Sequence, residues 1–359
     1  MDRNTNTLYI IRFFAALVVI LFHYTPLGLG QHIAFIIKNG GEAVNLFFFI
    51  SGFVLTISNA RYFEGDAPFQ KKAFYVKRFA RIYPLYLLAI LILLAFHFGI
   101  KRIDTPTVIY RMPFEMAGIQ KWFYSGSFNY PGWSISCEFF FYLLFPFIAQ
   151  YLRKYRRGFA WFVWVYYFVA LLATNLLSVW VKQDLSSIEK KLVSALYLNP
   201  LLLISIFMLG VLAGRYFIEN KIVAFKNSAF NLLAFVMAAA AAMLVKYYAP
   251  NGWGFLRGGI LAPVYFVLIL AVTSFRNQES KLLSNSVFIF LGDISYGMYI
   301  LQYPVYVFYT RYITTITTGL NLLGYCAALI CFCSLTHILI EKPLRIAITN
   351  RWLGKPARV

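Results

Sequence analysis

Charged residues are scarce in this sequence, and acidic residues are the scarcest of them. Of 359 residues only 13% are charged, with 13 Asp and Glu against 33 Lys and Arg, whereas 61% are hydrophobic. With a mean hydropathy of +0.68, this composition indicates a membrane-embedded chain and excludes an ordinary soluble enzyme. The net charge of +20 would suit a nucleic-acid-binding protein only if the basic residues shared a soluble face, but they lie between apolar spans.

Cysteine is also rare, and its four positions lack the spacing of a metal site or a disulfide framework. All four lie in apolar segments, so we expect them to be packing residues, and we expect no metal. They are Cys137, Cys326, Cys331 and Cys333. A cleavable signal peptide is not evident either, because the apolar run after MDRNTNT is too long and has no small-residue cleavage site.

Long apolar runs fill most of the chain, and each is long enough for a helix to cross about 30 Å of hydrocarbon. We predict an all-α polytopic membrane protein, a bundle of about ten transmembrane helices forming one domain over residues 1–359, with a short tail at 341–359. The predicted spans are 8–27, 42–59, 79–99, 132–150, 159–181, 194–214, 228–249, 257–274, 285–308 and 319–340. Basic residues are more numerous on the side of the N-terminus, so the positive-inside rule predicts that both termini are cytoplasmic.

The first span carries two ionisable side chains, Arg12 and His23. Eleven residues of helix turn through about 1100°, so both side chains lie on one face, about 16 Å apart along the axis. A cation left unpaired at membrane depth costs several kcal/mol, so we expect this face to point into the bundle.

Further ionisable residues could complete a site with this stripe. Glu138 is expected at nearly the depth of His23, where a carboxylate would orient the imidazole as a general base; simple charge neutralisation in the bundle is an equally good interpretation. Arg78 and Arg81 lie three residues apart at the cytoplasmic edge of the third span. They are either interfacial anchors or, with Arg12, an anion site suited to phosphates.

Other polar residues of the spans are better explained by packing. Gly52 indicates close helix contact, and the tyrosines of the ninth span indicate interhelical hydrogen bonds. His337 and Glu341 are four residues apart on one face and are expected to form a structural pair.

Several short motifs occur together. They are Arg12 with His23, LFFFISGF at 46–53, RFARIYPLY at 78–86, WSISCEFFFYLLFP at 133–146, FMLGVLAG at 207–214, ISYGMYILQYP at 294–304 and IEKPLR at 340–345. In this order, from about residue 8 to 345, they resemble the membrane-bound acyltransferase family three, which contains many bacterial O-acetyltransferases of surface polysaccharides.

The resemblance implies roles for individual residues. His23 would be the catalytic residue, and Arg12, Arg78 and Arg81 would handle the acyl-CoA donor. Beside these, Glu138 is the catalytic partner suggested by its depth, and three further residues are candidates to line the site: Trp133, Ser134 and Tyr296. The sequence departs from the family at Gln302, where His is frequent, and at Asn45, where Asp is frequent, which puts any role of those two positions in doubt.

The combined hypothesis is a multi-pass enzyme of the bacterial inner membrane. It would move an acetyl or similar acyl group from cytoplasmic acetyl-CoA to a hydroxyl of a cell-envelope glycan or lipid-linked sugar. His23 would either deprotonate the hydroxyl or be acylated first, and the sequence leaves both routes open. A transporter or flippase of lipid-linked glycans is the alternative, and a membrane sensor without turnover is a third possibility.

Overall fold

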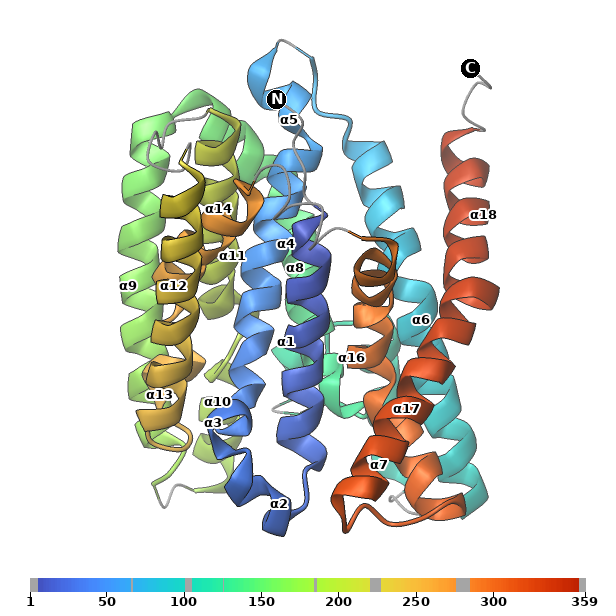
Figure 1. The fold of residues 1–359 in the computed structure, drawn as a ribbon. Helices are drawn as coiled ribbons and strands as arrows, with labels where there is room; N and C mark the ends of the chain where they lie inside the picture. The colour runs from blue at the N-terminus through green and yellow to red at the C-terminus, as the bar shows by residue number, and fades with distance from the viewer. Residues whose placement is uncertain are drawn as a thin grey trace. The chain divides into compact units, whose positions relative to one another are not determined.

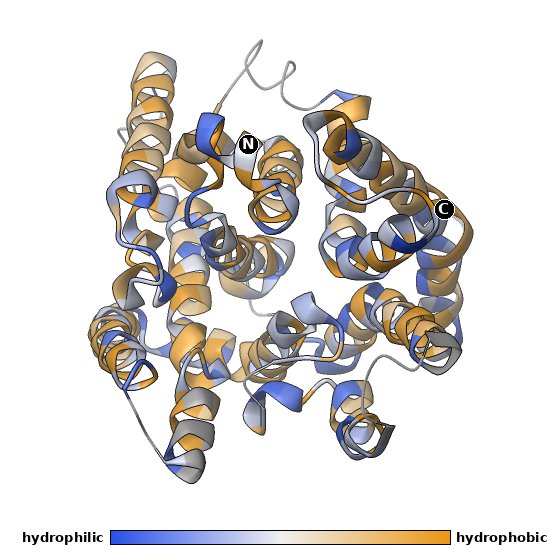
Figure 2. Cartoon of the chain, turned by 90° about the horizontal axis from the view of Figure 1, so that it is seen from below, coloured by the Kyte–Doolittle hydropathy of each residue, from blue (hydrophilic) through white to orange (hydrophobic). Residues whose placement is uncertain are grey.

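The structure is a computed structural model that describes residues 6–65, 67–100, 105–124, 126–183, 186–219, 227–275 and 285–354. Every regular element in these ranges is a helix (Figure 1), so the prediction of an all-α fold is confirmed. Hydrophobic residues predominate along the helices (Figure 2). Parts of the connections at 215–227 and 275–284, and the end of the tail at 341–359, lie outside the described residues.

The chain divides into two compact units. Unit 1 is Met1–Ala67 with Phe147–Ser295, and unit 2 is Pro68–Pro146 with Tyr296–Val359. The helices of unit 1 are α1 (Thr7–Tyr24), α2 (Leu27–His32), α3 (Ala34–Ile37), η1 (Gly40–Glu42), α4 (Ala43–Ser58), α5 (Ala60–Glu64), α9 (Arg156–Trp180), α10 (Ser187–Leu196), α11 (Pro200–Ile218), α12 (Ser228–Tyr248), α13 (Gly254–Arg257) and α14 (Ala262–Thr273). Unit 2 contains α6 (Lys71–Ile100), α7 (Thr105–Ala117), η2 (Gln120–Trp122), η3 (Tyr130–Gly132), α17 (Gly319–Thr336), the π-helical turn η5 (His337–Glu341) and α18 (Lys342–Leu353). Both α8 (Trp133–Lys154) and α16 (Ser286–Tyr312) run from one unit into the other.

Eight segments of the described chain are long and apolar enough to cross a membrane. They are Thr7–Tyr24, Ala34–Ser58, Lys71–His97, Tyr130–Lys154, Arg156–Trp180, Pro200–Ile218, Ser228–Tyr248 and Gly319–Leu353. Each corresponds to a predicted span. The remaining two predicted spans also form helices, but α14 has only 12 residues, and the 27-residue α16 carries polar residues such as Asp293 and Gln302 that lower its hydropathy. The orientation of the termini stays a prediction.

Unit 1 is built on close contact between α4 and α11. A Cβ atom at Gly52 would overlap the carbonyl oxygen of Phe207, and one at Gly210 would overlap the carbonyl oxygen of Phe49. The prediction of close helix packing at Gly52 is therefore confirmed. Small residues allow such backbone approach between membrane helices, and this approach holds the middle of α4 against α11.

Unit 2 is held by tyrosine hydroxyls that donate to backbone carbonyls. Tyr296 donates to Ile82 of α6 at 2.9 Å, Tyr299 to Pro131 at 3.2 Å and Tyr325 to Gln302 at 2.8 Å. The predicted interhelical hydrogen bonding of the ninth span is confirmed.

Two of the four cysteines fit the predicted packing role, because Cys137 and Cys333 are buried. Cys326 is only half-buried, and Cys331 is exposed on α17. The prediction is wrong for Cys331, since a thiol is apolar enough to lie on an outer helix face of a membrane protein as well as in its core.

Candidate functional site

The predicted site residues belong to both units, and the structure describes each unit by itself. Arg12 and His23 belong to unit 1. The others belong to unit 2: Arg78, Arg81, Trp133, Ser134, Glu138 and Tyr296. The pairing of His23 with Glu138, and the convergence of Arg12 with the arginines of α6, therefore stay predictions.

The first-span stripe lies on one unbroken helix, α1, so the geometry expected from the sequence applies. Arg12 and His23 are half-buried and share the helix side of the buried Ala16 and Val19. Phe14, on the opposite side, is 54% exposed. The two ionisable side chains thus lie on the protein-facing side of α1, as the cost of exposing a cation to lipid requires.

The His23 ring contacts aromatic neighbours at the end of α1, and η1 packs on one of these neighbours. The ring lies 4.8 Å from that of Phe22 and 6.2 Å from that of Tyr24, centroid to centroid. The turn η1 packs directly on Phe22, because a Cβ atom at Gly40 would lie 2.7 Å from Phe22 Cβ. Two residues after the imidazole, the buried Oγ1 of Thr25 has no hydrogen-bond partner among the described residues. A buried hydroxyl without a partner is unusual and can receive a polar group of a ligand.

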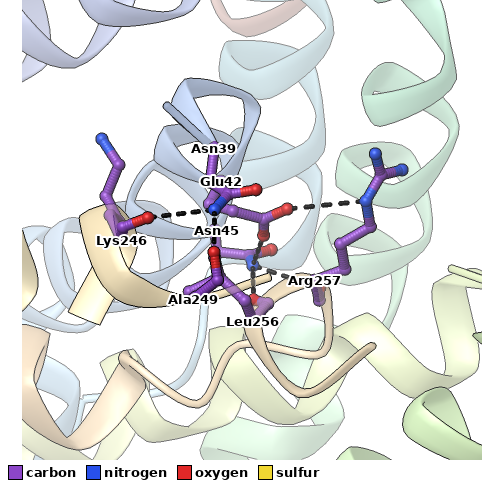
Figure 3. A network of polar contacts seen from close by, with 7 residues as sticks. All are labelled: Asn39, Glu42, Asn45, Lys246, Ala249, Leu256 and Arg257. Carbon is purple, nitrogen blue, oxygen red and sulfur yellow. Dashed lines mark hydrogen bonds and ion pairs between the residues drawn. The ribbon is translucent and has the colours of Figure 1, made fainter. Parts of the chain in front are cut away.

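A network of polar contacts lies where η1 joins α4, around Glu42 and Asn45 (Figure 3). The buried carboxylate of Glu42 accepts a hydrogen bond from Asn45 Nδ2 at 3.0 Å and lies 3.8 Å from Arg257 Nε. The same Asn45 amide donates to the carbonyls of Leu256 at 3.4 Å and Arg257 at 3.2 Å. The start of α4 is thereby fixed to α13, which is more than 200 residues away in the sequence.

Asn39 fixes the other side of η1. It adopts a left-handed conformation with φ 54°, which Asn tolerates better than most residues. Its side-chain amide donates to the carbonyls of Lys246 at 3.0 Å and Ala249 at 3.3 Å (Figure 3). The end of α12 is thereby joined to the same network.

Arg257 connects this network to the candidate catalytic residue. Its side chain is 42% exposed, and its terminal nitrogens point away from the Glu42 carboxylate (Figure 3). It interacts with the Tyr197 hydroxyl, and its charge acts on His23. Neither Glu42 nor Arg257 was predicted from the sequence to take part in a site, although an acidic residue at the start of an apolar span is a signal that could have identified Glu42.

In unit 2 the arginines form a cluster. Arg78 and Arg81 lie one turn apart on α6, and Arg78 also interacts electrostatically with Glu138, with Tyr142 and with Arg345 of α18. The Tyr142 hydroxyl donates to Glu138 Oε2 at 3.2 Å. Nε of Arg78 is buried and has no hydrogen-bond partner among the described residues. The cluster therefore holds more positive than negative charge.

The predicted lining residues differ in their surroundings. Tyr296 lies within the electrostatic reach of Glu138 and Tyr142, so it belongs to the neighbourhood of the arginine cluster. Ser134 is buried and donates to the Pro131 carbonyl at 3.1 Å. Trp133 begins α8 and is half-buried. The lining role of these three residues stays a prediction.

The segment before α8 is anchored by a buried carboxyl group, Glu115, which is 1% exposed. Its Oε2 accepts from the Ser127 hydroxyl and its Oε1 from the Phe128 amide, each at 2.6 Å. Burial raises the pKa of Glu115 to about 7 and lowers the pKa of the nearby Lys121 to about 8. These groups hold the chain that leads into Trp133.

Within the described ranges, no three or more His, Cys, Asp or Glu side chains are grouped closely enough to hold a metal ion. His337 and Glu341 are a pair, with Nδ1 and Oε2 2.9 Å apart and both residues buried, which confirms the structural pair predicted from their spacing.

Comparison with known proteins gives two matches. The family described as "Acyltransferase domain" matches residues 6–338. "Acyltransferase MdmB" of Streptomyces mycarofaciens is 35% identical over 156 residues, which is 40% of this chain and 39% of that protein. The chain thus matches about two fifths of the length of this curated relative. No solved structure matches.

Proposed function

Because the chain belongs to the acyltransferase domain family and its described residues include eight apolar helical segments long enough to cross a membrane, we propose that it is a transmembrane O-acyltransferase. Its donor is cytoplasmic acyl-CoA, with acetyl-CoA as the first candidate. Its acceptor is a hydroxyl of a cell-envelope glycan or a lipid-linked sugar. In this proposal the protein lies in the bacterial inner membrane with both termini in the cytoplasm, and it requires no metal.

The observation that carries this proposal is the position of His23 on α1. The imidazole is half-buried on the protein-facing side of the helix, two residues before Thr25, whose buried hydroxyl has no hydrogen-bond partner among the described residues. A general base must be partly shielded from water and adjacent to polar groups that can hold a substrate. His23 meets the first condition, and Arg12 lies on the same face of α1 about 16 Å away, which is about the reach that an extended pantetheine arm would need.

The proposed reaction needs one base, His23, and two substrates, the acyl-CoA donor and the acceptor. His23 takes the proton of the acceptor hydroxyl while the hydroxyl oxygen attacks the thioester carbonyl carbon. The C–S bond then breaks, and the imidazolium returns the proton to the CoA thiolate. In the second route an imidazole nitrogen attacks the thioester carbon, the C–S bond breaks, and the CoA thiolate leaves with the proton given up by the imidazole. The acceptor oxygen then attacks the acyl-imidazole, the C–N bond breaks, and the released imidazole takes the hydroxyl proton. Glu138 orients the imidazole in either route, which requires the two units to bring these residues together.

The donor's phosphates are proposed to bind Arg12, Arg78 and Arg81. The positive charges that act on Arg78 support an anion at that position, and so does its buried Nε, which has no hydrogen-bond partner within the described ranges. The planar guanidinium suits phosphate oxygens. The acyl group would then reach His23 past the lining residues Trp133, Ser134 and Tyr296.

The test uses purified full-length protein with acetyl-CoA and a panel of envelope glycans. We expect CoA thiol release that depends on one acceptor, together with an ester on that acceptor. A transporter of lipid-linked glycans would instead move its substrate across vesicles without releasing thiol. The enzyme assignment would be refuted if vesicles containing the protein transported the glycan but neither released CoA thiol nor formed an ester.

A further inference from the structure

We propose that Arg345 is a further cation of the donor-phosphate site, in addition to the arginines named above, and that it acts beside Arg78 and Arg81 in unit 2. The proposal rests on the function proposed above and extends it by a residue on α18. It assigns the phosphates of the CoA moiety to a cluster formed by two helices of unit 2. The alternative role for Arg345 is that of an interfacial anchor.

The packing of unit 2 places Arg345 next to α6. Helix α18 lies alongside α6 (Figure 1), and the charge of Arg345 acts on Arg78. Arg345 is half-buried, whereas Lys342 and Arg351 of the same helix are exposed. Of these three basic residues of α18, Arg345 is therefore the most buried, and it is the one whose charge acts on Arg78.

The π-helical turn η5 explains why Arg345 does not form the usual helical ion pair. Glu341 lies four residues before Arg345, the spacing at which oppositely charged side chains commonly pair. The Glu341 carboxylate is instead 2.9 Å from Nδ1 of His337 within η5. Such π-turns change the phase of a helix and occur frequently at functional sites.

The charges of the cluster do not balance. The positive charges of Arg81 and Arg345 both act on Arg78, together with the carboxylate of Glu138. Buried charges are normally paired, and Nε of Arg78 is buried without a partner among the described residues. An anion with several negative charges would satisfy the cluster, and the phosphates of CoA are such an anion.

The experiment measures CoA binding calorimetrically with the purified full-length protein and no acceptor. We expect Arg345→Ala to weaken CoA binding about tenfold or more, because a charge-assisted contact to phosphate is lost. Arg345→Lys keeps the charge and should lose less. The matched control is Arg351→Ala, which removes an exposed arginine of the same helix and should bind CoA as the wild type does.

A second readout separates binding from a structural role. Without CoA, Arg345→Ala should melt no earlier than the wild type, because removing the cation relieves its repulsion of Arg78. A residue that only anchors the helix would lower the melting temperature and leave CoA affinity unchanged.

The outcomes are distinguishable. If Arg345→Ala binds CoA as tightly as the wild type, the inference is overturned and the proposed function stands. If the wild type binds no CoA, the donor in the proposed function is wrong and the inference falls with it.

Discussion

The contact between α4 and α11 allows a sharp test of how unit 1 is packed. Substituting Gly52 by Ala places a Cβ atom against the carbonyl oxygen of Phe207 and 2.9 Å from the amide nitrogen of Val211. Ordinary contacts of a Cβ atom begin at 3.4 Å. Both neighbours are backbone atoms, so no side-chain rotation can relieve the overlap.

The magnitude follows from this rigidity. Overpacking typically costs 1–3 kcal/mol, and the upper end applies where backbone must move, so we expect a loss of about 3 kcal/mol. At roughly 2 °C per kcal/mol for a large domain, this is a fall of about 6 °C in melting temperature. Gly210→Ala should cost as much, because its Cβ atom would overlap the Phe49 carbonyl.

The measurement is thermal unfolding of the purified variants in one detergent. Gly28→Ala is the control, since a Cβ atom there meets nothing within 4 Å, and it should melt with the wild type. If Gly52→Ala and Gly28→Ala melt at the same temperature, the close approach of α4 and α11 is wrong.

Three further predictions concern single side chains. Glu42→Ala removes the acceptor of the Asn45 amide and the partner of Arg257, so we expect thermal unfolding to report a loss of about 1–3 kcal/mol, and Glu42→Gln should lose less. Burial raises the pKa of Glu115 from 4.5 to about 7, so between these pH values the folded state holds a proton that the unfolded state gives up. Stability should therefore fall by about 3 kcal/mol as the pH rises through this window; Glu115→Gln should remove that part of the pH dependence, and equal slopes for the two proteins would contradict the assignment. Arg12→Ala should abolish acyl transfer while the protein still inserts in the membrane, measured by ester formation in membranes with matched protein levels.

Much of the fold could be predicted from the sequence because membrane spans depend on local composition. Apolar runs of sufficient length specify helices wherever they occur, and α1 is continuous where the sequence indicated it. The spacing of His337 and Glu341 was enough to predict their contact, since residues four apart share a helix face. The short α14 was predicted as a full span because hydropathy does not show where a helix ends.

The parts that could not be predicted depend on distant pairing. Glu42 meets Arg257 only because the segment after α12 returns to η1, and a single sequence carries no signal of that return. Asn45 appeared only as a departure from a family pattern, yet its amide joins Glu42 to α13. The pairing of His23 with Glu138 depends on how two units come together, so it stays a prediction.

The most direct test of the central claim compares two histidines of unit 1. Transfer of a radiolabelled acetyl group from acetyl-CoA to the acceptor should fall by about a hundredfold or more in His23→Ala, because a general base or nucleophile is lost. Exposed His32 is the control, and His32→Ala should transfer at the wild-type rate. Wild-type transfer by a correctly folded His23→Ala protein would contradict the account.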